Sequence, residues 1–286
     1  MEMQVTPYGS KSGWAGWLQS AVLLAAMAGL LGITGFFLGG EWGLGFAALA
    51  LLGLFFTRLK TPLRNPLERL GAIALAPTQA PQLYWTLTEL CRRAEVPAPR
   101  LYFQPTSEPN AFTLGQGPQH EALVLTQGLF EHLDQAEIEA VMAHEVAHLK
   151  NRDLGFLYFA QLMGRLTEML AFWGQWMVLL ALPFFLKGQA DIPWLGFAFL
   201  VLAPRLYLRL LMAFSRSREF LADQVAIELT GQPMDLASAL DKLQRHLKRW
   251  QPVWPLGRPL NPWLQSHPTL GARIRRIEAN LPPRLP

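Results

Sequence analysis

The sequence predicts an α-rich integral membrane protein with about four transmembrane helices, arranged as two hairpins, and an α+β domain formed by its polar segments. Charged residues make up only 16% of the 286 residues, against roughly 25% in average soluble domains. The shortage is concentrated in a few long apolar runs, each close to the length that crosses a bilayer. Between and after these runs, patterns typical of short strands and amphipathic helices alternate.

The first predicted hairpin occupies residues 1–60. No charged residue occurs between Lys11 and Glu41, and residues 14–38 exceed the about 20 apolar residues that a span needs. After a short break, residues 42–56 are again uncharged. A cleaved signal peptide is the alternative, but its apolar region covers about 7–15 residues and would not be followed at once by a second run.

The second predicted hairpin occupies residues 166–214. Residues 169–186 carry no charge, and residues 192–212 carry only Arg205 and Arg209. Because apolar helices of this length also occur inside large soluble proteins, the flanking charges decide. Basic residues lie where each hairpin begins or returns, at Arg58, Lys60, Arg64, Arg69, Lys150, Arg152, Arg165, Arg205, Arg209, Arg216 and Arg218. The positive-inside rule places that side in the cytoplasm.

The polar segments, residues 61–165 and 215–286, are predicted to form the cytoplasmic domain. We expect a helix and then three short strands, over residues 79–93, 101–104, 111–114 and 122–126. Asp134 with Glu137 three positions later is a capping-box pattern, which begins a further helix that extends to Lys150.

That helix contains His144-Glu145-Val146-Ala147-His148, an H-E-x-x-H sequence. Spacing of four places both imidazoles on one face of the helix, where they can bind a single zinc ion. Glu145 lies beside them and can act as a general base toward a water at the open metal position. The alternative is two partly exposed histidines on an ordinary amphipathic helix.

A catalytic zinc needs a third protein ligand. No histidine follows at the spacing of metzincins, so we expect a distant glutamate, and Glu219 is the best candidate. Asp223 lies one turn further on, where it could accept the free N–H of a ligating histidine. A solvated helix face is the alternative explanation for both acidic residues.

The motif belongs to a longer block, residues 125–153, and further blocks lie at residues 109–112, 215–231 and 266–274. Together with the order of the hydrophobic segments, these blocks resemble the HtpX-type family of bacterial membrane zinc metalloproteases, which is related to the CAAX prenyl endopeptidases. The resemblance covers essentially the whole chain. It implies a zincin-like catalytic domain with one Zn²⁺ per chain, facing the cytoplasm from the bacterial inner membrane.

The resemblance also implies the roles of individual residues. Glu219 would be the third metal ligand, with Asp223 in support. Asn110, Ala111 and Phe112 would line the substrate cleft, where an extended peptide can add to a strand. His267 could stabilise the oxyanion, although helix capping or packing is its alternative role. Residues 250–263, rich in Trp and Pro, match nothing in the family, and their role stays open.

The activity implied is that of an endopeptidase for misfolded membrane or cytoplasmic proteins, in quality control and stress response. A membrane scaffold with a structural metal is an alternative, but such a site is normally closed by a fourth protein ligand. A CAAX-type processing peptidase would share the chemistry. Cys91 is the only cysteine, so neither an intrachain disulfide nor a cysteine metal cluster is possible. The net charge of +4 is explained by topology signals, and we expect no nucleic-acid partner. The oligomeric state stays open.

Overall fold

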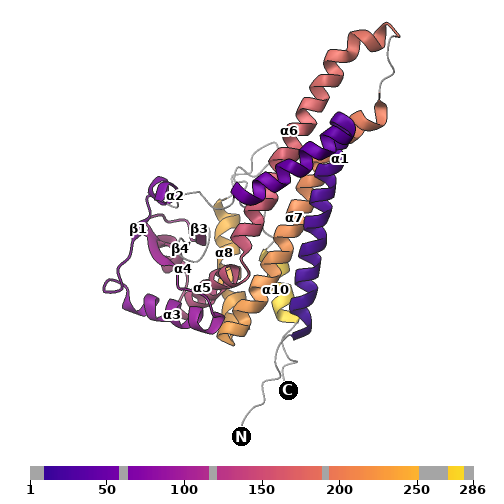
Figure 1. Cartoon of the computed structure of the whole chain (residues 1–286). Helices are drawn as coiled ribbons and strands as arrows, with labels where there is room; N and C mark the ends of the chain where they lie inside the picture. Colours follow the sequence, from indigo (N-terminus) through magenta and orange to yellow (C-terminus); the bar gives the residue numbers. More distant parts are fainter. Residues whose placement is uncertain (1–9, 58–63, 116–120, 189–192, 251–269, 280–286) are drawn as a thin grey trace. The chain divides into compact units, whose positions relative to one another are not determined.

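The computed structural model describes residues 10–57, 64–115, 121–188, 193–250 and 270–279 (Figure 1). The chain divides into two compact units. An apolar unit contains residues 14–60 and 156–215, and a polar unit contains residues 1–13, 61–155 and 216–286.

The apolar unit begins with α1 (Ser10–Thr57), which is two helical arms joined at a break. Gly39 and Gly40 leave the helical conformation, and Gly40 has a φ of 60°, which suits glycine because it has no Cβ. Beyond the break the chain turns back, and the second arm packs closely on the first. A side chain on Gly43 would collide with the carbonyl oxygen of Gly35. The break lies where the sequence predicted the turn of the first hairpin.

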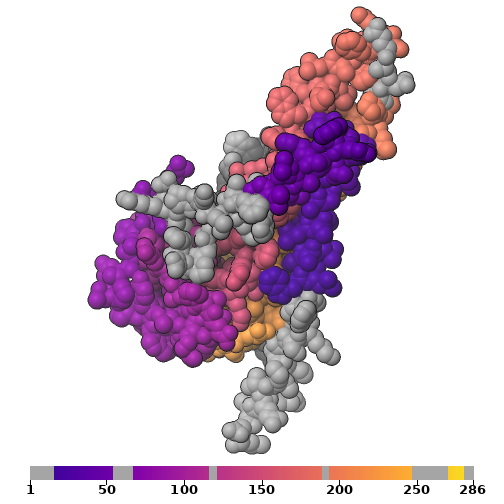
Figure 2. Space-filling view, viewed as in Figure 1, coloured from indigo at the N-terminus to yellow at the C-terminus, as the bar shows by residue number. Residues whose placement is uncertain are grey.

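Two further long helices complete this unit, α6 (Asp153–Leu186) and α7 (Trp194–Thr230). Among the described residues, three helices are long and apolar enough to cross a membrane: α1, α6 and α7. The structure thus supports a multi-pass membrane protein, while a separate crossing by the short second arm of α1 stays a prediction. Many large apolar side chains of α1, α6 and α7 are exposed, and Figure 2 shows α1 and α6 on the outer face of this unit.

Close packing holds the apolar helices together. The hydroxyl of Tyr207 donates a hydrogen bond to the carbonyl oxygen of Ala160 at 2.5 Å. A Cβ on Gly164 would lie 2.7 Å from the Tyr207 ring, so the glycine allows α6 and α7 to approach. Small residues and a buried hydrogen bond therefore help these helices to associate. This is expected in a membrane, where the hydrophobic effect does not drive helices together.

The polar unit contains a four-stranded sheet in the order β1-β2-β4-β3. The strands are β1 (Ile73–Ala74), β2 (Arg100–Gln104), β3 (Ala111–Gly115) and β4 (Glu121–Thr126). β2 and β4 are parallel and the other pairs are antiparallel. β4 is central and buried, because Leu123 and Leu125 are apolar and pack into the main core. β3 lies at the edge of the sheet.

This unit also contains the last part of α7 and several shorter helices, and those other than α2 contribute buried side chains to its main core. The shorter helices are α2 (Arg64–Arg69), α3 (Pro81–Ala94), α4 (Gln127–His132), α5 (Gln135–Lys150), α8 (Pro233–Trp250) and α10 (Leu270–Ala279). The predicted capping box is present: Asp134 and Glu137 exchange hydrogen bonds of 3.0 and 2.9 Å. Glu137 also accepts from Ser238 and Lys242 at 2.7 and 2.6 Å. Its buried carboxylate therefore fastens the start of α5 to α8.

Candidate metal centre

Two imidazoles on α5 form the middle of the candidate site. His144 and His148 lie one turn apart, and their Nε2 atoms are separated by 3.1 Å. Both side chains belong to residues that are buried. The spacing that predicted a shared helix face thus brings the two nitrogens to one point.

The buried carboxylate of Glu219 reaches the same point from α7. One of its oxygens lies 3.4 Å from Nε2 of His144, and the other lies 3.6 Å from Nε2 of His148. In a tetrahedral site with bonds of about 2.0–2.1 Å, neighbouring donor atoms are about 3.3 Å apart. The three observed separations are close to that value, although the two from Glu219 start at different oxygens, so the two imidazoles and this carboxylate could share one divalent metal ion after a small rotation of the carboxylate.

A second carboxylate lies close by. One donor atom each from His144, Glu145 and His148 can be chosen so that all three lie within 4.8 Å of one another, so Glu145 competes with Glu219 for the place of third ligand. We favour Glu219, because it is within 3.6 Å of both Nε2 atoms. The carboxylate of Glu145 instead accepts a hydrogen bond from the Thr113 hydroxyl of β3 at 3.0 Å.

Each imidazole also contacts a carboxylate through its other nitrogen. Nδ1 of His148 lies 2.7 Å from Asp153, and Nδ1 of His144 lies 3.1 Å from Asp223. In a neutral imidazole, an Nδ1–H that donates to a carboxylate leaves Nε2 as the acceptor. These partners therefore select the tautomer, and they orient both Nε2 atoms toward the metal position.

Two buried arginines balance these carboxylates. Arg218 contacts Asp153 through a short ion pair, and both residues are 1% exposed. Arg273, on α10, donates to Asp223 at 2.8 and 2.5 Å and lies 3.2 Å from Glu219. Because a buried charge is costly unless it is paired, the site is a network in which each carboxylate has a fixed counter-charge.

This network changes the protonation of its members. Burial and the charge of Arg273 oppose a proton on His144, but the hydrogen bond with Asp223 and other carboxylate contacts outweigh them, and the pKa of His144 rises to about 9. Burial also opposes protonation of His148, yet its hydrogen bond with Asp153 raises that pKa as well. A metal therefore competes with protons for both imidazoles, and its binding releases them.

The residues expected to line the substrate cleft lie at the edge of the sheet. Ala111 and Phe112 begin β3, and Asn110 immediately precedes it. The backbone of Asn110 is held by Thr126, whose hydroxyl contacts its N and O atoms at 2.8 and 2.9 Å, while the residue itself is exposed. Ala111 packs on the main core, but Phe112 packs on a small cluster that also contains Val124. Neighbouring side chains of a strand point to opposite faces, so the side chain of Phe112 lies on the face of the sheet away from the main core.

Two predictions fall elsewhere. His267 lies outside the described residues, as does nearly all of the Trp- and Pro-rich stretch, residues 250–263. Their roles stay as the sequence suggested them.

Four residues of this site received no role from sequence reasoning: Thr113, Asp153, Arg218 and Arg273. The only available signal was position, since all but Thr113 belong to the blocks that carry the resemblance. Neither helical spacing nor residue type identifies them, because their contacts join α5 to β3, α6, α7 and α10.

Comparison of the sequence with known proteins shows which family the chain belongs to. The model for Peptidase family M48 matches residues 77–281. Three similar relatives are each described as a protease HtpX homolog. The one from Thermococcus sibiricus is 34% identical, over 91% of this chain and 94% of the relative. The one from Acaryochloris marina is 36% identical, over 91% and 90%, and the one from Burkholderia thailandensis is 36% identical, over 80% and 79%.

A solved structure supports the fold. The crystal structure of S. mikatae Ste24p is similar, with a TM-score of 0.56 at 20% sequence identity. The similar region covers 93% of this chain and 67% of Ste24p. At this identity, the likeness is one of fold.

Proposed function

The chain belongs to peptidase family M48 and is a membrane-associated metalloprotease, and on that premise we propose that it is a zinc-dependent endopeptidase which removes misfolded membrane and cytoplasmic proteins. One observation carries the proposal: the two Nε2 atoms lie 3.1 Å apart, the two oxygens of Glu219 lie 3.4 and 3.6 Å from them, one from each, and a further carboxylate is close by. His144, His148 and Glu219 would hold one zinc. The bound metal would supply a Lewis acid that polarises the scissile carbonyl and acidifies a water.

Glu145 performs the proton transfers in this proposal. Its carboxylate takes a proton from the attacking water and later delivers one to the leaving amine. The Thr113 hydroxyl, 3.0 Å away, orients that carboxylate. Asp153 and Asp223 keep the imidazoles in the tautomer that binds metal, while His267 remains the proposed oxyanion donor.

The edge of β3 is the proposed peptide-binding element. The described residues place no strand beyond β3, so an extended substrate can pair with its main chain, and such pairing does not depend on substrate sequence. The exposed amide of Asn110 offers one further donor and one acceptor. This mode of binding suits an enzyme that accepts many unfolded chains.

We propose residues 61–165 and 215–286 as the catalytic domain, and residues 1–60 and 166–214 as membrane hairpins. By the positive-inside rule the catalytic domain faces the cytoplasm, and the membrane is the bacterial inner membrane. Reporters fused after Asp153 and near Gly188 test this directly. A cytoplasmic signal from the first and an external signal from the second are expected, and the reverse pattern would refute the topology.

The decisive test of catalysis is Glu145→Gln. Glutamine preserves the size of the side chain but cannot accept the proton, so casein digestion by the detergent-purified protein should fall roughly 10²- to 10⁴-fold. Zinc content, measured by elemental analysis, should stay near one per chain. Glu139→Gln, on the same helix, is the matched control and should digest casein normally. Wild-type turnover by the Glu145 variant would refute the role of the base. Digestion of casein, which carries no prenyl group, would favour this function over CAAX processing.

A further inference from the structure

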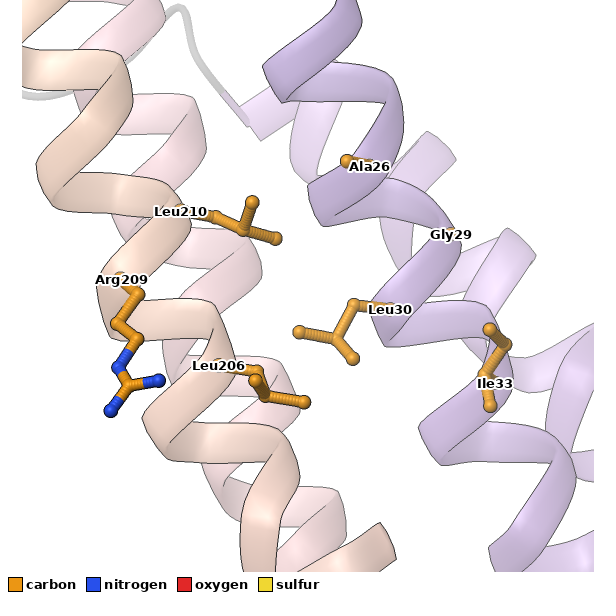
Figure 3. Close-up of a pocket in the computed structure, with 7 residues that line it drawn as sticks. All are labelled: Ala26, Gly29, Leu30, Ile33, Leu206, Arg209 and Leu210. Carbon is orange, nitrogen blue, oxygen red and sulfur yellow. The ribbon is translucent and has the colours of Figure 1, made fainter.

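A groove runs between α1 and α7 within the apolar unit (Figure 3). Its volume is about 530 Å³, and it is lined by Ala26, Gly29, Leu30 and Ile33 of α1 and by three residues of α7. All but one of the lining side chains are apolar. The exception is the exposed guanidinium of Arg209.

Arg209 lies within the hydrocarbon region of the bilayer. At the two ends of the first arm of α1, Trp17 contacts Phe156 and Phe37 contacts Phe199. Trp17 and Phe37 are 20 positions apart, about 30 Å along a helix, which is the thickness of the hydrocarbon core. Arg209 is 10 positions from Phe199, about 15 Å along α7. By the same scale Arg216, where the polar unit resumes, is about 10 Å beyond Arg209, so the cation lies inside the hydrocarbon region of α7.

The groove supplies no counter-charge for this cation. Residues 10–38 of α1 contain no Asp or Glu, and α7 contains none before Glu219. Within the part of the chain that the structure describes, no ion pair joins Arg209 to Glu168 of α6 either. A charge at this depth is costly, and such residues normally pair or serve a function. No described residue supplies the anion, so another molecule can supply it.

The shape of the groove indicates which molecule. Ala26 and Gly29 are small and exposed, and a Cβ on Gly29 would meet no atom within 4 Å. Small residues on one face let a second helix approach closely in a membrane. Apolar walls, a small-residue floor and a cation inside the hydrocarbon region are together complementary to a transmembrane helix that carries a carboxylate at the same depth.

We propose that this groove binds transmembrane helices of substrates that carry an unpaired Asp or Glu at the depth of Arg209. The inference rests on the proposed function and names one class of its substrates. In an assembled membrane protein, such a carboxylate is paired with a partner inside the bundle. In a misfolded or unassembled protein it is exposed, so pairing with Arg209 selects damaged chains.

The test uses the full-length enzyme in neutral phosphatidylcholine vesicles. Two single-span substrates share one unfolded tail and differ only in an Asp or Leu at the depth of Arg209. The Asp substrate should be cleaved about tenfold faster, the ratio that one interhelical polar contact can produce. Arg209→Gln should reduce this ratio to about one, and Arg209→Glu should favour a Lys substrate instead. Each rate is divided by the rate of casein digestion in the same sample.

Arg205→Gln is the matched control. Arg205 is also an exposed arginine of α7, one turn away, but it does not line the groove and donates to the carbonyl oxygen of Val201. This variant should keep the wild-type ratio. Equal cleavage of the Asp and Leu substrates by a casein-active wild type would refute the proposal. A preference for the Asp substrate that survives Arg209→Gln would also refute it. The same holds for a preference that appears only when anionic lipid is added, because a lipid would then occupy the groove.

A binding readout separates this proposal from catalysis. In a Glu145→Gln background and with copper–phenanthroline added as oxidant, a cysteine introduced by Gly29→Cys should form a disulfide with a cysteine placed beside the substrate Asp. The native Cys91 is buried and should not compete. Ala25→Cys, exposed on α1 but outside the groove, is the control and should cross-link several-fold less. Equal cross-linking at both positions would refute the groove even if the enzyme proved inactive on casein.

Discussion

The metal centre and the membrane groove differ in how their charged side chains are paired. In the metal centre, Arg218 and Arg273 are at most 5% exposed, and each contacts a carboxylate that also orients a histidine. In the groove, Arg209 is exposed, and no residue that the structure describes forms an ion pair with it. A desolvated charge needs a counter-charge. The first site contains its own and is preorganised, whereas the second is incomplete until a partner binds.

The largest expected effect comes from removing a donor of the metal centre. Glu219→Ala should lose both metal and activity, because two imidazoles alone hold zinc weakly and the network keeps unbalanced positive charge. The loss of affinity should exceed the roughly 10- to 100-fold that follows from mutating an outer partner of a ligand. Zinc content after dialysis and casein digestion measure it. A Glu219→Ala protein that retained stoichiometric zinc would show that Glu145 or another group is the third ligand.

A smaller effect, on stability, should distinguish a paired arginine of the metal centre from an exposed arginine of α7 outside the groove. Arg218→Ala leaves the carboxylate of Asp153 buried without its main counter-charge and should cost about 3–5 kcal/mol. Arg205→Leu removes an exposed, unpaired charge from an apolar helix and should be neutral or stabilising. Thermal unfolding of both variants in the same detergent tests the contrast. Comparable destabilisation by the two substitutions would contradict it.

The smallest effect concerns the orientation of Glu145. Thr113→Val removes a hydroxyl that donates to the carboxylate, at nearly constant volume. A hydrogen bond to a charged group contributes about 1.5–3 kcal/mol, so kcat should fall roughly 10- to 100-fold while KM and zinc content stay unchanged. Thr113→Ser should restore most of the activity. If the valine variant changed KM alone, Thr113 would act on the substrate strand and not on the base.

Parts of this fold were predictable because their causes are local. The capping box that begins α5 depends on residues three positions apart, and the break in α1 depends on a glycine pair. The shared face of His144 and His148 follows from helical geometry alone. Conversely, the parallel pairing of β2 with β4 was not predicted, because the order of strands depends on which apolar faces pack together.

The sequence by itself determined the chemistry available to this protein. It supplies the H-E-x-x-H helix, the long apolar runs, and Arg205 and Arg209 within the apolar run of residues 192–212. Only the tertiary structure decided how these groups are used. For Glu219 and Asp223, spacing allowed either a ligand set or a solvated face, and the fold buries both against α5. It also supplies Arg273 from α10 and Thr113 from β3 to the same centre, and it places Arg209 in a groove without an anion. The physical reason is that burial and charge pairing depend on distances in space, which residues far apart in the chain acquire only when their helices and strands pack.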